Sequence, residues 1–106
     1  MEKMSLKTAT IHDLEWINTK YREVDFVPSN YNNEHILIAH VSKKEAGLGR
    51  LVKIDANNTE LGGIYVFPEF RGQHVADCIV TGLCNQNPFK NTTIWCLPFE
   101  NLVPFY

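Results

Sequence analysis

The stretch ELGGIYVFPEFRGQHVA, residues 60–76, decides the fold of this chain. Its first eight residues are rich in apolar and β-branched side chains, which predicts a strand, and Pro68 ends that strand. The pair Arg71-Gly72 then opens a turn. From Val75 onward, apolar residues recur at steps of three and four, which is typical of an amphipathic helix. The stretch therefore predicts a strand, a turn and a helix in succession.

The turn between this strand and this helix has a chemical use. The first N–H groups of a helix lack partners within the helix, and the helix dipole adds partial positive charge there, so the turn suits a pyrophosphate. Gly72 lets the backbone approach the phosphates, and Arg71 adds a charge at the rim. Taken alone, the hexapeptide is equally compatible with a turn in which Arg and Gly serve turn geometry only.

The residues of this turn resemble the coenzyme-binding signature of the Gcn5-related N-acetyltransferases (GNAT). That signature is Arg or Gln, two variable residues, Gly, one variable residue, and Gly or Ala; here residues 71–76 read RGQHVA. The preceding LGGIYVFPEF also resembles the family's strand before the signature, including the proline and acidic residue that follow it. Three further segments resemble other parts of the family in the same order: TATIHDLEWI (8–17), EHILIAHVSKKEAGLGRLVKI (34–54) and TTIWCLPFENLVPFY (92–106).

The remaining sequence predicts a strand or a helix in each of those segments. The expected elements are a strand at 6–11, a helix carrying Leu14, Ile17 and Tyr21, a hairpin of 35–41 with 47–54 joined by a loop at 42–45, a turn at 56–59, and a last strand at 92–97. This order indicates an α+β fold in one domain over residues 1–106. The resemblance implies a GNAT-type mixed, mostly antiparallel sheet flanked by helices, without the family's last two strands.

Composition excludes several classes of function. The formal net charge of −2 and the pI near 6.0 give no broad positive field for nucleic acid. No apolar run is long enough for a membrane span or a secretory signal, so the cytoplasm is the expected location and no membrane partner is expected. Cys78, Cys84 and Cys96 lack metal or redox spacing and are expected to be reduced and mostly buried, and the scattered histidines suggest no metal site.

The resemblance assigns roles to particular residues, with acetyl-CoA (coenzyme A) as cosubstrate. In the family, the strand backbone pairs with the pantetheine arm of the coenzyme; the matching residues are Ile64, Tyr65, Val66 and Phe67, and the Val66 amide is our choice to polarise the thioester carbonyl. The phosphates are expected at Arg71, Gly72, Gln73, His74, Val75 and Ala76. Glu60 matches the position of a general base, with a solvated strand-end carboxylate as the alternative. Tyr106 matches the tyrosine that protonates the leaving thiolate.

Two residue positions and the absence of two strands depart from the family pattern. His74 stands where the signature has its central glycine, which puts a Cβ beside the phosphates. A helical conformation there would leave its N–H able to donate, and we expect coenzyme binding to survive. Phe99 replaces an asparagine seven residues before the tyrosine. The chain also reaches Tyr106 without the two further strands, which is the pattern of a truncated form, a minimal variant or a fragment.

Two hypotheses of function follow. The first is an N-acetyltransferase that moves an acetyl group from acetyl-CoA to a primary amine of a small molecule or protein. The second is a catalytically weak or inactive GNAT-fold module that acts by binding or assembly. An uncovered apolar edge at Ile94 to Leu97 also predicts a homodimer, unless the last residues fold back over the sheet as a short helix.

Overall fold

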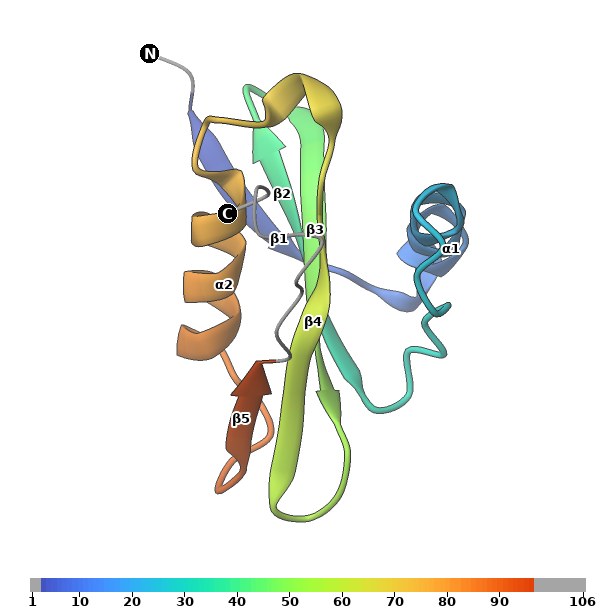
Figure 1. Ribbon diagram of the computed structural model, residues 1–106, viewed down its shortest axis with the longest axis vertical. Helices are drawn as coiled ribbons and strands as arrows, with labels where there is room; N and C mark the ends of the chain where they lie inside the picture. Colours follow the sequence, from blue (N-terminus) through green and yellow to red (C-terminus); the bar gives the residue numbers. More distant parts are fainter. Residues whose placement is uncertain (1–2, 97–106) are drawn as a thin grey trace.

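Five strands form one sheet in chain order, with one helix on each face, in a computed structural model that describes residues 3–96 (Figure 1). The elements are β1 (Met4–Thr8), the 3-10 turn η1 (Ile11–Asp13), α1 (Leu14–Glu23), β2 (Glu34–Val41), β3 (Lys44–Lys53), β4 (Asn58–Val66), the 3-10 turn η2 (Pro68–Phe70), α2 (Val75–Asn85) and β5 (Thr93–Cys96). The predicted α+β class, with a mostly antiparallel sheet between helices, is confirmed. Leu97 and the tail that follows it lie outside the described residues.

Strands β1 to β4 pair antiparallel, and β5 pairs parallel with β4. A parallel pair needs a long crossover, and α2 supplies it between these two strands. The β4–β5 register runs from Asn58 opposite Thr93 to Leu61 opposite Cys96. The described part of β5 therefore pairs with only the first half of β4.

The prediction of a loop at residues 42–45 is wrong, because the loop is two residues shorter. Ser42 and Lys43 alone make the turn, with φ of 50° and 73°, and Lys44 already belongs to β3. Positive φ at both central residues is the geometry of a type I′ turn, whose twist matches that of the flanking strands. The hairpin is therefore tighter than the polar composition of the segment suggests.

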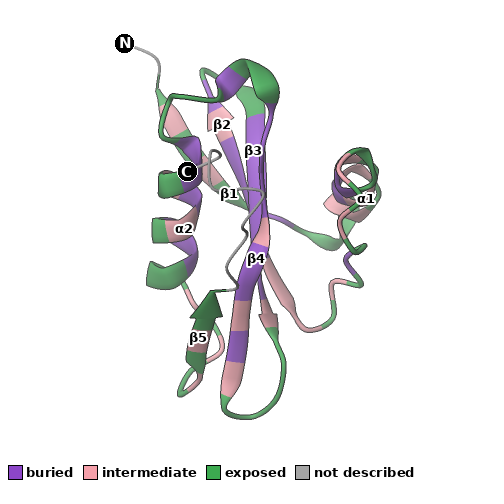
Figure 2. Ribbon diagram, in the orientation of Figure 1, coloured by how far each residue is buried: buried purple, intermediate pink, exposed green. Residues whose placement is uncertain are grey.

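The side of α2 that faces the sheet is buried, as are long stretches of β3 and β4 (Figure 2). Val75, Ile79 and Leu83 are buried, as the helical spacing predicted. The helix lies close enough to the sheet that a Cβ added at Gly82 would lie 2.4 Å from Leu6 Cδ1. The absence of a side chain at Gly82 therefore allows the close approach of α2 to this face.

The opposite face is covered by α1, which contacts the sheet through large side chains. Ile17 and Tyr21 are fully buried, as predicted. The ring of Trp16 meets that of Phe67 edge to face at 6.0 Å. At the start of the helical segment the Thr10 N–H donates to Asp13 Oδ2 at 2.9 Å, and this bond lowers the pKa of Asp13.

The three cysteines are free, but the prediction that they are mostly buried is wrong. Cys78 is half-buried, whereas Cys84 and Cys96 are exposed, because they lie on the outer side of α2 and at the rim of the sheet. Trp95 on β5 is 59% exposed. Among residues 3–96, no helix has the length and apolar character that crossing a membrane requires.

Candidate functional site

Beyond Leu61, one edge of β4 is left without a strand partner among the described residues. The paired part of β5 ends at Cys96, opposite Leu61, while β4 continues to Val66. Figure 1 shows the short β5 beside only one end of the long β4. The edge that remains presents backbone donors and acceptors on which an extended ligand can pair as a strand would.

A bulge at Gly63 begins this open segment. The register of β4 against β3 shifts by one residue there, and Gly63 has a φ of 61°. Such a bulge bends a strand and re-aims the groups that follow it. The Tyr21 hydroxyl donates to the Gly63 carbonyl at 2.9 Å, so α1 holds the bulge in place.

The amides that follow the bulge alternate between the two edges of β4. The Phe67 N–H donates to the Ala46 carbonyl on the β3 side at 2.9 Å. Because strand residues alternate, the amides of Val66 and Ile64 face the opposite, open edge. On that side, Arg71 Nε lies 3.4 Å from the Val66 carbonyl. The fold thus directs two amides toward the open edge: that of Val66, which the resemblance singled out, and that of Ile64.

The turn from η2 into α2 brings the predicted phosphate-binding residues to the end of this open edge. His74 is the N-cap of α2 with φ 63° and ψ 25°, a left-handed conformation and not the ordinary right-handed helical one. That conformation is the physical reason why glycine suits this position; histidine is among the side chains that tolerate it best. Gly72 is also left-handed, with φ 83°, and no atom lies within 4 Å of a Cβ built on it.

The charges around the start of α2 are mixed. Arg71, Gly72, Gln73 and His74 are exposed, whereas Val75 and Ala76 have buried side chains and contribute their backbone. The carboxylate of Asp77 lies in the first turn, with Oδ2 3.5 Å from His74 Nδ1. An anion at this helix start would gain the helix dipole and the Arg71 charge, and it would be repelled by Asp77.

Glu60 lies on the α1 side of β4, at the wall of a cavity of about 250 Å³. The cavity is lined by Asp25, Phe26, Val27, Arg50, Val52, Glu60, Gly62 and Gly63. Four residues of strand, roughly 13 Å at about 3.3 Å per residue, separate Glu60 from Ile64. A proton taken by Glu60 from an amine at the open edge would therefore have to travel through water.

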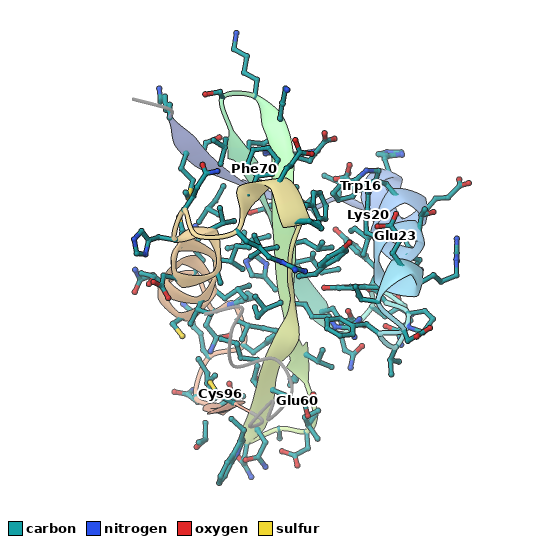
Figure 3. All side chains as sticks on the ribbon, turned by 45° about the horizontal axis from the view of Figure 1, so that its top comes forward. Trp16, Lys20, Glu23, Glu60, Phe70 and Cys96 are labelled. Atoms are coloured by element: carbon teal, nitrogen blue, oxygen red, sulfur yellow. The ribbon has the colours of Figure 1, made fainter. Side chains whose placement is uncertain are left out.

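A second carboxylate, missed in the sequence, lies at the other end of β4. The Tyr65 hydroxyl donates to Glu23 Oε1 at 3.1 Å. Lys20 and Glu23 both lie on α1 (Figure 3), with Lys20 Nζ 3.4 Å from Glu23 Oε2. Burial and this hydrogen bond raise the pKa of the Tyr65 phenol. Lys20 and Glu23 show the spacing of a helical ion pair, but nothing in the sequence indicates that Tyr65, 42 positions away, joins them.

A buried polar network supports the floor of the cavity and was also missed. Arg50 Nη1 lies 3.4 Å from Glu34 Oε1, and its Nη2 donates to the Val27 carbonyl at 2.8 Å. The guanidinium also stacks on the ring of Tyr21 at 4.5 Å. Burial raises the pKa of Tyr21, so its hydroxyl stays protonated and donates to Gly63.

Two expectations of the sequence cannot be placed. Tyr106 and Phe99 lie outside the described residues. In the part of the chain that is described, no group of three or more His, Cys, Asp or Glu side chains is placed to hold a metal ion.

No protein-family model and no curated protein matches this sequence, but solved structures do match the fold. A protein of Clostridium acetobutylicum described as a predicted acetyltransferase, crystallised with acetyl-CoA, superposes with a TM-score of 0.73 over 98% of this chain and 86% of its own, at 16% identity. AAC(6')-Iy, in complex with a bisubstrate analogue of coenzyme A and acetylneamine, gives 0.68 over 93% of this chain and 82% of its own, at 15% identity. An acetyltransferase of the GNAT family from Streptococcus pneumoniae gives a TM-score of 0.68 over 92% of this chain and 77% of its own, at 20% identity.

The chain has the GNAT acetyltransferase fold. Within this fold, the bulge at Gly63 lies on β4, and η2 with the turn at 71–74 connects that strand to the start of α2. The cavity beside Glu60 lies on the α1 side of β4.

Proposed function

We propose that this chain is an acyl-CoA-dependent N-acetyltransferase that transfers the acetyl group of acetyl-CoA to a primary amine. One observation carries the proposal: within residues 3–96 the edge of β4 beyond Leu61 has no strand partner, and the chain leads from β4 through η2 and a short turn into the N-terminus of α2. An extended pantetheine arm can pair with the edge of β4, and the N-terminus of α2 can hold a pyrophosphate. The likeness to acetyltransferase structures, two of them crystallised with acetyl-CoA or a coenzyme A analogue, supports it.

The reaction requires few groups from the protein. The neutral amine nitrogen attacks the thioester carbon, the carbonyl oxygen takes up negative charge, and an open-edge amide of Ile64 or Val66 donates a hydrogen bond to that oxygen. The carbon–sulfur bond then breaks, and the coenzyme leaves as a thiolate. The nitrogen loses its proton to a carboxylate or water, and the thiolate takes up a proton, for which Tyr106 is the proposed donor.

Two carboxylates compete for the role of general base. Glu60 is the one that the resemblance implies, and it borders the cavity. Glu23 reaches the other end of β4 through the Tyr65 hydroxyl. We assign the role to Glu60, because Glu23 already accepts from Tyr65 and pairs with Lys20, whereas within residues 3–96 the Glu60 carboxylate forms no hydrogen bond or ion pair.

The charge at the start of α2 favours a second candidate function, a GNAT-fold binding module with weak or no catalysis. Asp77 places a carboxylate in the first turn, where the phosphates would bind, and His74 replaces a glycine with a side chain. Both features weaken coenzyme binding. Measured affinity therefore separates the two candidates.

Calorimetric titration with acetyl-CoA tests the coenzyme site. We expect saturable binding, and Arg71→Glu should weaken it about tenfold or more, because a negative charge then faces the phosphates. Lys90→Glu is the matched control, since it makes the same charge reversal in the exposed segment beyond the other end of α2. Absence of binding at millimolar coenzyme, or equal losses in both variants, would contradict the proposal.

Thiol release from acetyl-CoA with a panel of primary amines tests the base. Glu60→Gln should lower kcat about a hundredfold, and the acidic limb of the pH–rate profile should disappear. Glu23→Gln is the parallel variant. If it abolishes turnover while Glu60→Gln does not, the base is Glu23.

We also propose that two chains pair along the β5 edge. The described part of β5 is short and largely exposed at the rim of the sheet, and exposed strand edges pair readily. Light scattering after size exclusion should give the mass of a dimer. Trp95→Lys or Ile94→Lys should shift it toward a monomer, and a monomer mass for the unaltered chain would show that this edge is already protected.

A further inference from the structure

The peptide that joins Gly63 to Ile64 lies inside the bulge of β4. In the register both residues stand opposite the single residue Gly49 of β3, and the extra residue of a bulge is displaced from the regular ladder. The carbonyl of this peptide, that of Gly63, accepts a hydrogen bond from the Tyr21 hydroxyl at 2.9 Å. A Cβ added at Gly63 would lie 2.7 Å from the Tyr21 oxygen, so only glycine admits this close approach. The peptide is therefore held from α1.

One peptide unit links the Tyr21 bond to an amide of the open edge. The carbonyl of Gly63 and the N–H of Ile64 belong to the same planar, trans peptide, in which the two groups point in opposite directions. Strand alternation turns the Ile64 N–H toward the open edge of β4, while the carbonyl meets Tyr21. A hydrogen bond that polarises a peptide carbonyl also strengthens the N–H of that peptide as a donor. A bond at one end of this peptide therefore acts on the other end.

The Tyr21 side chain is itself fixed from several sides. It is fully buried, and its ring packs against Phe26 with the centroids 5.8 Å apart. The Arg50 guanidinium lies 4.5 Å from the ring centroid and is held in turn by Glu34 and by the Val27 carbonyl. Burial raises the pKa of Tyr21, although Arg50 opposes part of that rise, so the phenol keeps its proton. The hydroxyl is thus a fixed and protonated donor.

The second amide of the open edge, that of Val66, has a different setting. The carbonyl in its own peptide is that of Tyr65, which strand alternation turns toward β3 as an ordinary group of the ladder. The Tyr21 hydroxyl donates to the carbonyl in the Ile64 peptide instead. Among residues 3–96, the polar network on the α1 face therefore reaches one of the two amides, that of Ile64.

We infer that Tyr21 is a positioning residue for acetyl transfer and that it makes the Ile64 N–H the donor to the thioester oxygen. As the amine attacks, that oxygen takes up negative charge, and the N–H that Tyr21 orients and polarises through Gly63 donates to it. Tyr21 itself touches neither the coenzyme nor the amine and transfers no proton. This inference rests on the proposed acetyl transfer and names a residue on which its rate depends. Because the charge develops only in the transition state, Tyr21 should affect rate more than affinity.

The test compares two variants that each remove one hydroxyl. Tyr21→Phe keeps the buried ring and loses the bond to Gly63. Tyr31→Phe is the matched control, because the Tyr31 hydroxyl also donates to a backbone carbonyl, that of Ala9 at 3.2 Å, away from β4. Both variants lose one hydrogen bond, so their urea midpoints should fall by similar amounts. With the amine of the panel that reacts fastest, Tyr21→Phe should lower kcat about tenfold and leave the KM for acetyl-CoA within about twofold, whereas Tyr31→Phe should change neither.

Two spectroscopic measurements report the hydrogen bonds directly. With ¹³C at the thioester carbonyl of bound acetyl-CoA, Tyr21→Phe should raise the infrared frequency of that carbonyl, because a weaker donor leaves the C=O bond stronger. Tyr31→Phe should leave the frequency unchanged. In the ¹⁵N–¹H spectrum of the chain without coenzyme, Tyr21→Phe should shift the Ile64 amide resonance more than that of Val66.

The outcomes separate this inference from the proposed function. If acetyl-CoA binds and amines are acetylated, but Tyr21→Phe and Tyr31→Phe show equal kcat and equal carbonyl frequencies, the proposed function stands and the inference is wrong. A loss of affinity for acetyl-CoA as large as the loss of kcat, or a larger resonance shift at Val66 than at Ile64, also overturns the inference. If acetyl-CoA does not bind at all, the proposed function fails and the inference fails with it.

Discussion

The two faces of the sheet are held together by different forces. Under α2, aliphatic side chains such as Ile79 and Leu83 pack against the strands. Under α1, the buried layer includes the Arg50–Glu34 ion pair, stacked on Tyr21 and bonded to the backbone of Val27. One face depends on close packing, and the other depends on polar groups that satisfy one another.

This difference corresponds to the proposed division of labour. The close-packed face under α2 holds this helix in place, so that the turn at its start presents fixed N–H groups to the coenzyme. The polar face holds the bulge at Gly63 through the Tyr21 hydroxyl and leaves a cavity beside it for the acceptor. Changes on the two faces should therefore affect different properties.

The largest effect should come from the ion pair on the α1 face. Arg50→Met leaves the Glu34 carboxylate, whose side chain is 5% exposed, without its cation, and should cost about 3 kcal/mol of unfolding free energy. The cost falls at the lower end of the range because Ser29 and Asn30 still donate to Glu34. Urea unfolding measures it. The double variant Arg50→Met with Glu34→Gln should recover part of the loss, and no recovery would show that packing, not charge, dominates here.

A similar loss is expected on the α2 face, but without any rescue. Ile79→Ala removes a fully buried side chain from close-packed surroundings and should cost about 3 kcal/mol. Val80→Ala, at the half-buried neighbouring position, is the control and should cost about 1 kcal/mol or less. Equal costs in the two variants would mean that α2 is not held as tightly as its contacts indicate.

A smaller effect of opposite sign should come from His74. His74→Gly relieves a left-handed side-chain conformation and should stabilise the fold by about 1 kcal/mol. It should also tighten acetyl-CoA binding, because a side chain beside the phosphates is removed. Gln73→Gly is the control: its φ is not positive, so no gain is expected. Destabilisation by His74→Gly would show that the pairing of His74 with Asp77 outweighs the strain.

The smallest effect should be a dependence of stability on pH through His35. Burial lowers the pKa of this histidine below its usual 6.5, and its buried Nε2 has no hydrogen-bond partner among the described residues. The unfolded chain therefore takes up a proton at a higher pH than the folded chain does. Stability is fully present above about pH 7 and falls as the pH drops through 6.5 toward 5. His35→Leu should make the urea midpoint nearly independent of pH between these values. An unchanged slope of the midpoint against pH would assign the dependence to other titratable groups.

The sequence predicted the elements better than it predicted their surroundings. The helix at Val75 was evident from its apolar spacing, and the strand before it from its composition, because local periodicity follows from which face is buried. The loop at 42–45 was drawn too long because polar side chains say nothing about the positive φ that lets two residues reverse the chain. The cysteines were expected inside on the basis of residue type, yet position on the outer side of α2 and at the sheet rim decided otherwise.

The residues of the candidate site also fall into two groups, those found from the sequence and those found only in the structure. The turn at 71–76 and the strand before it were found from a contiguous motif, and Glu60 from its position in that motif. Glu23, Tyr21 and Arg50 were not found, because each acquires its meaning from a partner brought close only by folding. Tyr21 and Gly63, for example, are 42 positions apart in the sequence.

By itself the sequence determined the order of strands and helices, the apolar face of α2 and the strand–turn–helix unit, since each is set by neighbours within one or two turns of chain. Only the tertiary structure decided that the described part of β5 pairs with β4 no further than Leu61, that His74 adopts a left-handed conformation, and that two carboxylates line one cavity. These features depend on register, on backbone angles and on contacts across the sheet. Residue type constrains none of the three until the chain has folded.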